Sequence, residues 1–343
     1  MEFLSEYGMF VAKTLTIVLS ILVVVVGIIV AATRGKEHHD QAQIELTKLN
    51  EKYDEVSMSM NSLMLSKDEM KKVEKEHKEK EKSEKKVKST ADKQRIFVLD
   101  FDGDIKASAV THLREEITAI LMVARKQDEV FVRLQSAGGM VHTYGLAASQ
   151  LKRIRDKDIH LTISVDKVAA SGGYMMACVA NNILAAPFAI LGSIGVVAQM
   201  PNFNRLLKKH DVDFEMITAG EYKRTLTMFG ENTDESRQKF KEDIEDVHVL
   251  FKDFVKHERP IVDIEKVSTG EYWFGTRAKD LALVDELKTS DDYLLEKVKE
   301  ADLYKVTQVE KKSLGDKFSK FLQTVSEKVL LGLQTKTNEN RLS

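Results

Sequence analysis

The sequence has little of several residues that would point to common classes of protein. Its 343 residues include one cysteine, three prolines and one tryptophan. The single cysteine, Cys178, excludes an intramolecular disulfide and any metal site built from several cysteines. The formal net charge is −2, so no excess of positive charge favours nucleic acid as a partner. The length is sufficient for one large domain or two ordinary ones.

One long hydrophobic run is present, from Thr14 to Thr33. It has 20 residues without a charge, and as a helix it would span about 30 Å, the thickness of the bilayer hydrocarbon. We expect residues 1–35 to form a single-pass transmembrane anchor. A cleaved signal peptide is the alternative, but the run is longer than an ordinary signal core and Glu2 and Glu6 precede it. More basic residues follow the run than precede it, which weakly favours a cytoplasmic C-terminal side.

Composition divides the remainder of the chain into three parts. Residues 36–94 are rich in lysine and glutamate, with opposite charges at i,i+4 spacing, and predict a charged, partly helical stalk. Residues 95–300 carry the apolar runs of a catalytic domain. Residues 301–343 form a tail with an amphipathic helical pattern at 314–333. We expect that helix to pack on its own domain or on a neighbouring subunit, with membrane docking as the alternative.

Short apolar runs alternate with helical patterns within residues 95–300. Runs typical of strands lie at 96–101, 130–134, 161–165, 182–187 and 214–219. Apolar residues recur at helical spacing over 110–124 and 144–154. This alternation predicts an α/β fold with a largely parallel sheet.

Two glycine-containing turns directly follow predicted strands. They read SAGG at 136–139 and ASGG at 170–173. Ligands of parallel sheets gather where the strands end, so the N–H groups of Gly138 and Gly172 could point at one oxyanion. Ser171, in the second turn, is either the cap of a helix or a nucleophile.

A serine nucleophile requires a base that takes its proton. The histidines are scattered, and none stands in a recognisable triad setting. Lys223 follows the predicted strand 214–219, where desolvation could keep a lysine neutral. The residues alone leave Lys223 open between a base and a surface lysine.

Three stretches together resemble a known family. They read DKVAASGGYMMACVA at 166–180, LGSIGVVAQMPNF at 191–203 and TAGEYKRTLT at 218–227. They are similar to the signal peptide peptidase A family of Ser-Lys membrane peptidases, and within it to the SohB type. The resemblance runs from about Arg95 to Leu287.

The resemblance implies a role for each residue of the site. Ser171 would be the nucleophile and Lys223 the general base. The N–H groups of Gly138 and Gly172 would form the oxyanion hole, and Ser193 would hydrogen-bond the lysine. The implied fold is a ClpP/crotonase-like spiral of ββα units. The implied reaction is peptide hydrolysis through an acyl-enzyme, without a metal or organic cofactor.

One position departs from the family pattern. Ala137 stands where the family usually has proline. Alanine can adopt the φ angle of proline, but the unfolded chain then has more conformations to lose. We therefore expect the turn before Gly138 to be less preorganised.

The resemblance also implies partners and a location. Substrates would be peptides or proteins, such as membrane-associated signal peptide remnants or misfolded segments, and the anchor would contact lipid. The location would be the bacterial inner membrane, and the resemblance favours the periplasmic side for the catalytic domain. Longer family members hold two related halves and this chain one, so we expect a ring-shaped homo-oligomer whose sites are shared between subunits.

Two other functions compete with the peptidase. A crotonase-like acyl-CoA enzyme would share the fold and the oxyanion hole, but needs no serine nucleophile with a lysine partner. A catalytically inactive membrane scaffold would use the stalk and tail for partners. The presence of both Ser171 and Lys223 favours the peptidase over either.

Overall fold

The computed structural model describes residues 6–17, 20–21, 43–87 and 93–309. The chain divides into one unit of residues 44–308 and another of residues 1–43 with 309–343. Within the described residues no helix is both long and apolar enough to cross a bilayer. Most of the hydrophobic run at 14–33 lies outside the described residues, as does the whole amphipathic pattern at 314–333.

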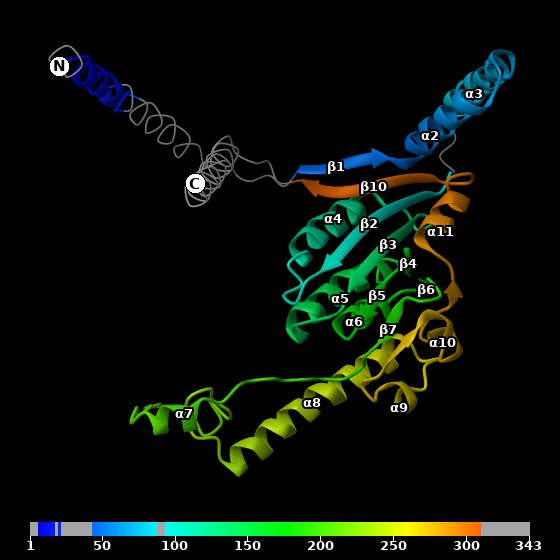
Figure 1. Ribbon diagram of the computed structural model, residues 1–343. Helices are drawn as coiled ribbons and strands as arrows, with labels where there is room; N and C mark the ends of the chain where they lie inside the picture. The colour runs from blue at the N-terminus through cyan, green and yellow to red at the C-terminus, as the bar shows by residue number, and fades with distance from the viewer. Residues whose placement is uncertain (1–5, 18–19, 22–42, 88–92, 310–343) are drawn as a thin grey trace, which may run out of the picture. The chain divides into compact units, whose positions relative to one another are not determined.

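A sheet of ten strands among the described residues forms the centre of the larger unit (Figure 1). Its main path runs in the order β1 (Gln43–Lys48), β10 (Asp302–Val309), β2 (Arg95–Gly103), β3 (Glu129–Ser136), β4 (His160–Val165), β6 (Asn182–Ala185) and β9 (Glu286–Leu287). Strands β5 (Val168–Ala170), β7 (Ile190–Gly192) and β8 (Tyr272–Phe274) branch from β3. The pairings from β10 to β9, and those of β5 with β3 and β7, are parallel, whereas β7 and β8 are antiparallel.

Helices follow most of the strands. Before the first parallel strand lie α2 (Leu49–Met64) and α3 (Lys67–Val87). Within the sheet region lie α4 (Val110–Val123), α5 (Val141–Arg155) and α6 (Gly172–Ala177). The later helices are α7 (Asn204–Lys209), α8 (Asp234–Glu258), α9 (Ile264–Val267), α10 (Gly275–Asp280) and α11 (Ser290–Lys297).

The side chains of β2 alternate between two apolar layers. Phe97, Leu99 and Phe101 belong to the layer that contains the inner faces of α4 and α5. Ile96 and Val98 belong to the opposite layer, which includes residues of α11. Successive side chains of a strand point to opposite faces, so a strand that is covered on both faces reads as a continuous apolar run. Figure 1 shows α4 and α5 together beside β2 and β3.

The predicted α/β fold is confirmed, and most of its elements lie where the sequence indicates. The runs at 96–101, 130–134, 161–165 and 182–187 became β2, β3, β4 and β6. The helical patterns at 110–124 and 144–154 became α4 and α5.

The prediction of a strand at 214–219 is wrong. These residues have no regular secondary structure, and Ile217 is 96% exposed. An apolar run becomes a strand only where a neighbouring strand takes up its backbone hydrogen bonds, and this run has no such neighbour among the described residues. Lys223 therefore does not follow a buried strand.

The sheet also extends beyond the expected domain limits of 95 and 300. Strand β1 lies in the segment expected to be a stalk, and β10 lies in the segment expected to be the tail. Strand β10 pairs in parallel with β2, aligning Leu303 with Ile96. Most of its side chains are only half-buried, and the strand lacks the continuous apolar run of an inner strand.

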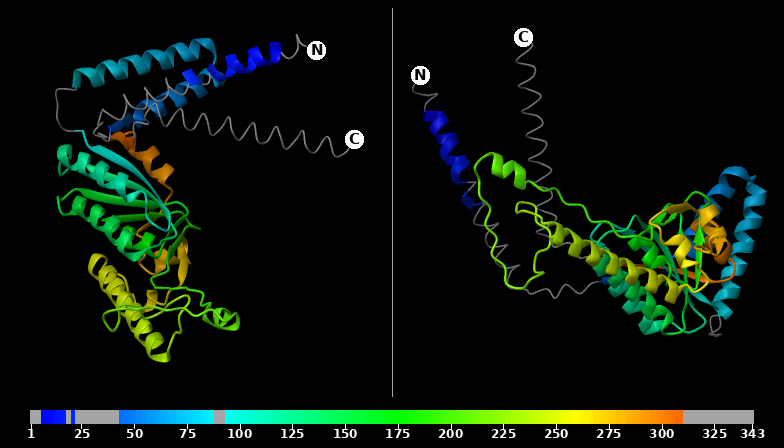
Figure 2. Two further views of the ribbon diagram at one scale, coloured as in Figure 1. Left: turned by 90° about the vertical axis from the view of Figure 1, so that its left-hand side faces the viewer. Right: turned by 90° about the horizontal axis from the view of Figure 1, so that it is seen from below.

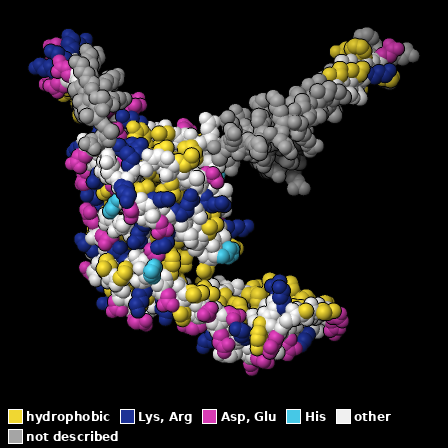
Figure 3. Space-filling view, turned by 180° about the vertical axis from the view of Figure 1, so that it is seen from behind, with side chains coloured by type: hydrophobic (Ala, Val, Ile, Leu, Met, Phe, Trp, Pro, Cys, Tyr) yellow, Lys and Arg dark blue, Asp and Glu magenta, His cyan; other side chains and the backbone are white. Residues whose placement is uncertain are grey.

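Residues 195–233, which we call the arm, leave the sheet after β7 and return through α8 (Figures 1 and 2). Most arm side chains are exposed. The exposed apolar ones are Val197, Met200, Phe203, Leu206, Val212, Phe214, Met216, Ile217, Tyr222, Met228 and Phe229. Figure 3 shows hydrophobic side chains gathered along the projecting part of this unit. A monomer seldom exposes so much apolar surface in one place.

Candidate active site

Ser171 occupies a sharp turn between β5 and α6. Its φ of +53° lies in the left-handed region, which is costly for a residue with a side chain. Its N–H donates to the Gly192 carbonyl oxygen at 2.8 Å, and its own carbonyl accepts the Met175 N–H at 3.0 Å. The Ser171 hydroxyl makes no capping hydrogen bond to α6. The hydroxyl therefore does not cap α6 in this structure, and Ser171 as a residue is half-buried.

Gly138 and Gly172 lie close to Ser171 and to each other. A Cβ added to Gly138, which has φ of +89°, would lie 2.8 Å from both Ser171 Cβ and Gly172 N. A Cβ added to Gly172 would lie 2.4 Å from Cγ of Tyr144. Only glycine fits at either position. As the first residue of α6, Gly172 has an N–H without an acceptor inside the helix.

The Gly138 N–H already has an acceptor. It donates to Ser136 Oγ at 3.0 Å across the turn that follows β3. This is the local serine-to-backbone bond typical of a tight turn. The Gly138 N–H can serve an oxyanion only by sharing or exchanging that acceptor.

Ser193 lies in a third turn, at the end of β7. Strand β7 pairs with β5 and aligns Gly192 with Ala170, so Ser193 emerges beside Ser171. Ser193 has φ of +52°, and its N–H donates to the Glu271 carbonyl oxygen at 2.6 Å. Three turns from the adjacent strands β3, β5 and β7 therefore meet at one edge of the sheet.

His248 contacts the same turn and was not singled out by the sequence. It lies on α8, and its Nε2 is 3.3 Å from the carbonyl oxygen of Ile194, the residue after Ser193. Its Nδ1 is 4.0 Å from the Glu245 carboxylate. His248 and Ile194 are 54 positions apart in the chain. A contact over that separation produces no local or periodic pattern in the sequence, so it could not be predicted.

Lys223 stands apart from these residues. It is exposed, in the arm between α7 and α8, and its backbone N–H donates to the Gly220 carbonyl at 3.2 Å. Within the described part of one chain, no hydrogen bond or ion pair joins Lys223 to Ser171 or Ser193. The fold thus brings four of the five predicted site residues together and leaves the lysine in the arm.

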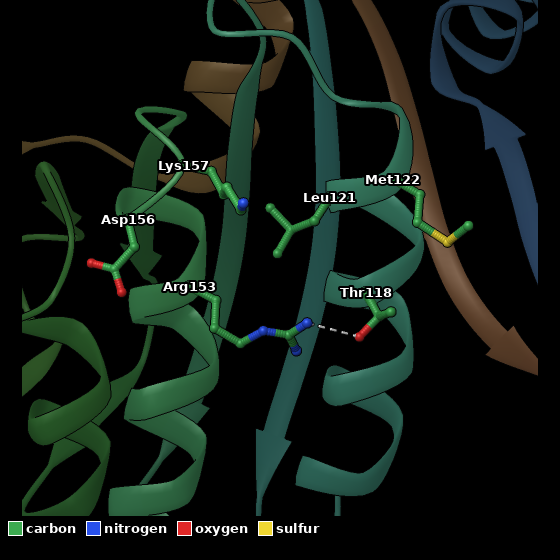
Figure 4. Close-up of a pocket in the computed structure, with 6 residues that line it drawn as sticks. All are labelled: Thr118, Leu121, Met122, Arg153, Asp156 and Lys157. Atoms are coloured by element: carbon green, nitrogen blue, oxygen red, sulfur yellow. Dashed lines mark hydrogen bonds between the residues drawn. The ribbon is translucent and has the colours of Figure 1, made fainter.

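Two other features, the thiol of Cys178 and a surface hollow, are weaker candidates for an active site. Burial raises the pKa of the Cys178 thiol and keeps it in its unreactive form. A hollow of about 420 Å³ lies between α4 and α5, away from the three turns (Figure 4). Its lining includes Leu121 and Met122, and Arg153 donates to Thr118 Oγ1 at 3.1 Å across it. None of the predicted site residues lines this hollow.

Comparison with known families identifies two matching regions. The description "Peptidase family S49 N-terminal" matches residues 2–151, and "Peptidase family S49" matches residues 153–304. Together they cover most of the chain. The second region contains Ser171, Ser193 and Lys223.

Individual relatives extend this similarity over the whole chain. A probable protease SohB of Haemophilus influenzae is 49% identical over 349 residues, covering 99% of this chain and 98% of that protein. A probable protease SohB of Buchnera aphidicola subsp. Acyrthosiphon pisum is 50% identical, covering 93% and 94%. A solved membrane-bound stomatin-specific protease, 1510-N, is 14% identical with a TM-score of 0.42, covering 60% of this chain and 85% of that one. That structural similarity is too low to carry an argument.

Proposed function

The chain belongs to peptidase family S49 and is a serine peptidase of the SohB type, and from this premise we propose that Ser171 and Lys223 form its catalytic dyad. Neutral Lys223 accepts the Ser171 proton while Ser171 Oγ attacks the peptide carbonyl carbon. The amine leaves with a proton from Lys223, and water then hydrolyses the acyl-enzyme. No step requires a metal or an organic cofactor.

The geometry around Ser171 is the observation that carries this proposal. The Ser171 N–H, in its left-handed turn, donates to the Gly192 carbonyl, and the Gly138 backbone approaches both Ser171 and Gly172 closely. Amides held in place before the reaction stabilise the developing oxyanion without reorganisation. The Gly172 N–H is one donor, and the Gly138 N–H is the second, sharing its hydrogen between Ser136 Oγ and the oxyanion.

Lys223 reaches Ser171 from a second copy of the chain. The arm that carries Lys223 has exposed apolar side chains that a neighbouring subunit would cover. Head-to-tail contact of this kind closes into a ring when its rotation allows. Ser193, beside Ser171, would then accept a hydrogen bond from the incoming lysine or donate one to it, and so fix the position of the lysine.

We also propose the finer architecture and the location that the family resemblance implies. A ClpP/crotonase-like spiral is consistent with the parallel path from β2 to β9 and its branch through β5 and β7. The uncharged run at 14–33 would anchor the protein in the bacterial inner membrane, with the catalytic unit on the periplasmic side. Such an anchor favours membrane-associated substrates such as signal peptide remnants or misfolded segments.

A serine-directed label tests the proposal. The purified full-length protein is treated with a fluorophosphonate in detergent or lipid, and the modified residue is located by peptide mapping. We expect one major adduct, at Ser171, which is absent from Ser171→Ala. A folded, membrane-inserted protein that takes no label at Ser171 would support the inactive scaffold instead.

A further inference from the structure

Tyr144 is a buried residue that the proposed mechanism does not use. It lies on α5, its side chain is fully buried, and burial raises the pKa of its phenol, so the hydroxyl keeps its proton. The Tyr144 hydroxyl donates to the Asp104 carbonyl oxygen at 2.7 Å. It also lies 2.5 Å from Ser136 Oγ, itself almost fully buried.

The direction of each hydrogen bond is set by the available protons. With the single phenolic proton donated to the Asp104 carbonyl oxygen, Ser136 donates to Tyr144 Oη. Ser136 Oγ also lies 3.4 Å from the Gly103 carbonyl oxygen. The Ser136 lone pairs then face the Gly138 N–H, which donates to them at 3.0 Å. A directed chain runs from Gly138 through Ser136 and Tyr144 to the Asp104 carbonyl.

The ring of Tyr144 makes the second contact with the site. The ring packs directly against Gly172, because a Cβ added to Gly172 would lie only 2.4 Å from Tyr144 Cγ. The same tyrosine therefore touches Gly172 with its ring and reaches the Gly138 turn through Ser136. It also fixes the segment after β2 through Asp104.

We propose that Tyr144 is a positioning residue that, through Ser136, holds the Gly138 turn and Gly172 at a fixed separation around Ser171. This rests on the proposed function. It also accounts for how a turn with Ala137 in place of proline stays ordered, because buried hydrogen bonds replace the restriction that proline would give.

The test compares two tyrosines that lose only a hydroxyl. Tyr144→Phe keeps the ring against Gly172 but removes the link to Ser136. Tyr174→Phe is the matched control, because Tyr174 is equally buried and its hydroxyl donates at 3.0 Å to the Leu283 carbonyl. Hydrolysis of a fluorogenic apolar peptide gives kcat and KM, and thermal unfolding reports the fold.

We expect Tyr144→Phe to lower kcat about tenfold with little change in KM, because the loss concerns the transition state. Its affinity for a peptide aldehyde, which forms a tetrahedral adduct with serine, should fall by a similar factor. Tyr174→Phe should keep kcat. Adding Ala137→Pro to Tyr144→Phe should recover most of the lost kcat, because proline restricts the turn independently.

Several results would overturn the inference. These are an unchanged kcat in Tyr144→Phe, an equal loss in Tyr174→Phe, a change in KM alone, or no recovery with Ala137→Pro. Labelling of the wild-type protein separates this inference from the proposed function. No adduct at Ser171 defeats the proposed function, whereas a labelled wild type with an unimpaired Tyr144→Phe defeats only the role of Tyr144.

Discussion

Ser171 lies at the end of β5 beside fully buried residues such as Ala169 and Tyr174, whereas Lys223 lies in an arm where most side chains are exposed. The turns around the serine are fixed by paired strands and by glycines that admit no side chain. The arm is held within its own chain by hydrogen bonds and ring contacts between its own residues, such as Asn202 with Thr227 and Phe203 with Phe229. Under the proposed function, the exposed apolar arm would bring Lys223 to the Ser171 of a second copy.

The largest expected effect comes from dividing the dyad between subunits. Ser171→Ala and Lys223→Ala should each lose at least about a thousandfold in kcat, because a nucleophile or its base is gone. Co-expressed in one ring, the two variants should regain about a quarter of the wild-type activity, the fraction of junctions that pair an intact serine with an intact lysine. Peptide hydrolysis by the purified mixed oligomers measures this.

The control for mixing is a ring of Lys223→Arg with Lys223→Ala. No subunit of that ring has an intact lysine, and arginine stays charged and cannot accept the proton, so this mixture should stay inactive. Mixed oligomers of the alanine variants that assemble and show no regained activity would place both dyad residues in one subunit.

The apolar surface of the arm should be the next most sensitive feature. Ile217→Asp puts a charge at a position that is 96% exposed in one chain, and should dissociate the oligomer and reduce activity more than tenfold if a neighbour covers it. Met122→Asp is the matched control, because Met122 is 81% exposed on α4. Sedimentation measures assembly, and equal behaviour of the two variants would mean that the arm is not the contact.

The hydrogen bond from His248 to the turn of Ser193 should have a smaller effect. His248→Leu removes the donor to the Ile194 carbonyl where the arm leaves the sheet, and should lower kcat about tenfold by loosening the turn. His248→Gln keeps an N–H donor and should retain most of the activity. A glutamine variant as slow as the leucine variant would show that packing of the ring, and not its hydrogen bond, is what matters.

The strands and the serine turn could be predicted because their signals are local. The residues of β2 and β3 are buried on both faces and read as apolar runs, and glycine-rich turns follow β3 and β5. The run at 214–219 has the same appearance, yet it forms no strand, because pairing depends on a neighbour that sequence does not specify. The hydrogen bonds of Tyr144 with Asp104 and of His248 with Ile194 join residues that are 40 and 54 positions apart. No local pattern in the sequence predicts such contacts.

The smallest effect on activity is expected at the amino end of β3, at the far end of the strand from the serine turn. Asp128 immediately precedes β3 and is fully buried. Burial alone would raise the pKa of Asp128, but hydrogen bonds from Arg95 and Arg125 outweigh it and lower the pKa to about 2. Its ordinary value in the unfolded chain is about 3.9. Asp128→Asn should therefore leave kcat unchanged, because the strand separates Asp128 from the serine turn.

The same substitution should lower the free energy of unfolding at pH 7 by about 2–3 kcal/mol, the free energy that corresponds to this pKa difference. The folded pKa is depressed, so this stabilisation is complete above pH ~4 and is lost as the pH falls toward 2. Urea unfolding at pH 7 and pH 3 should accordingly show a larger difference between wild type and variant at pH 7. Asp158→Asn, which breaks an exposed pair with Lys126, is the control and should change little. A loss of kcat in folded Asp128→Asn would mean that the amino end of β3 influences the serine turn, and the contrast between the buried serine turn and the exposed arm would then have to include the whole of β3.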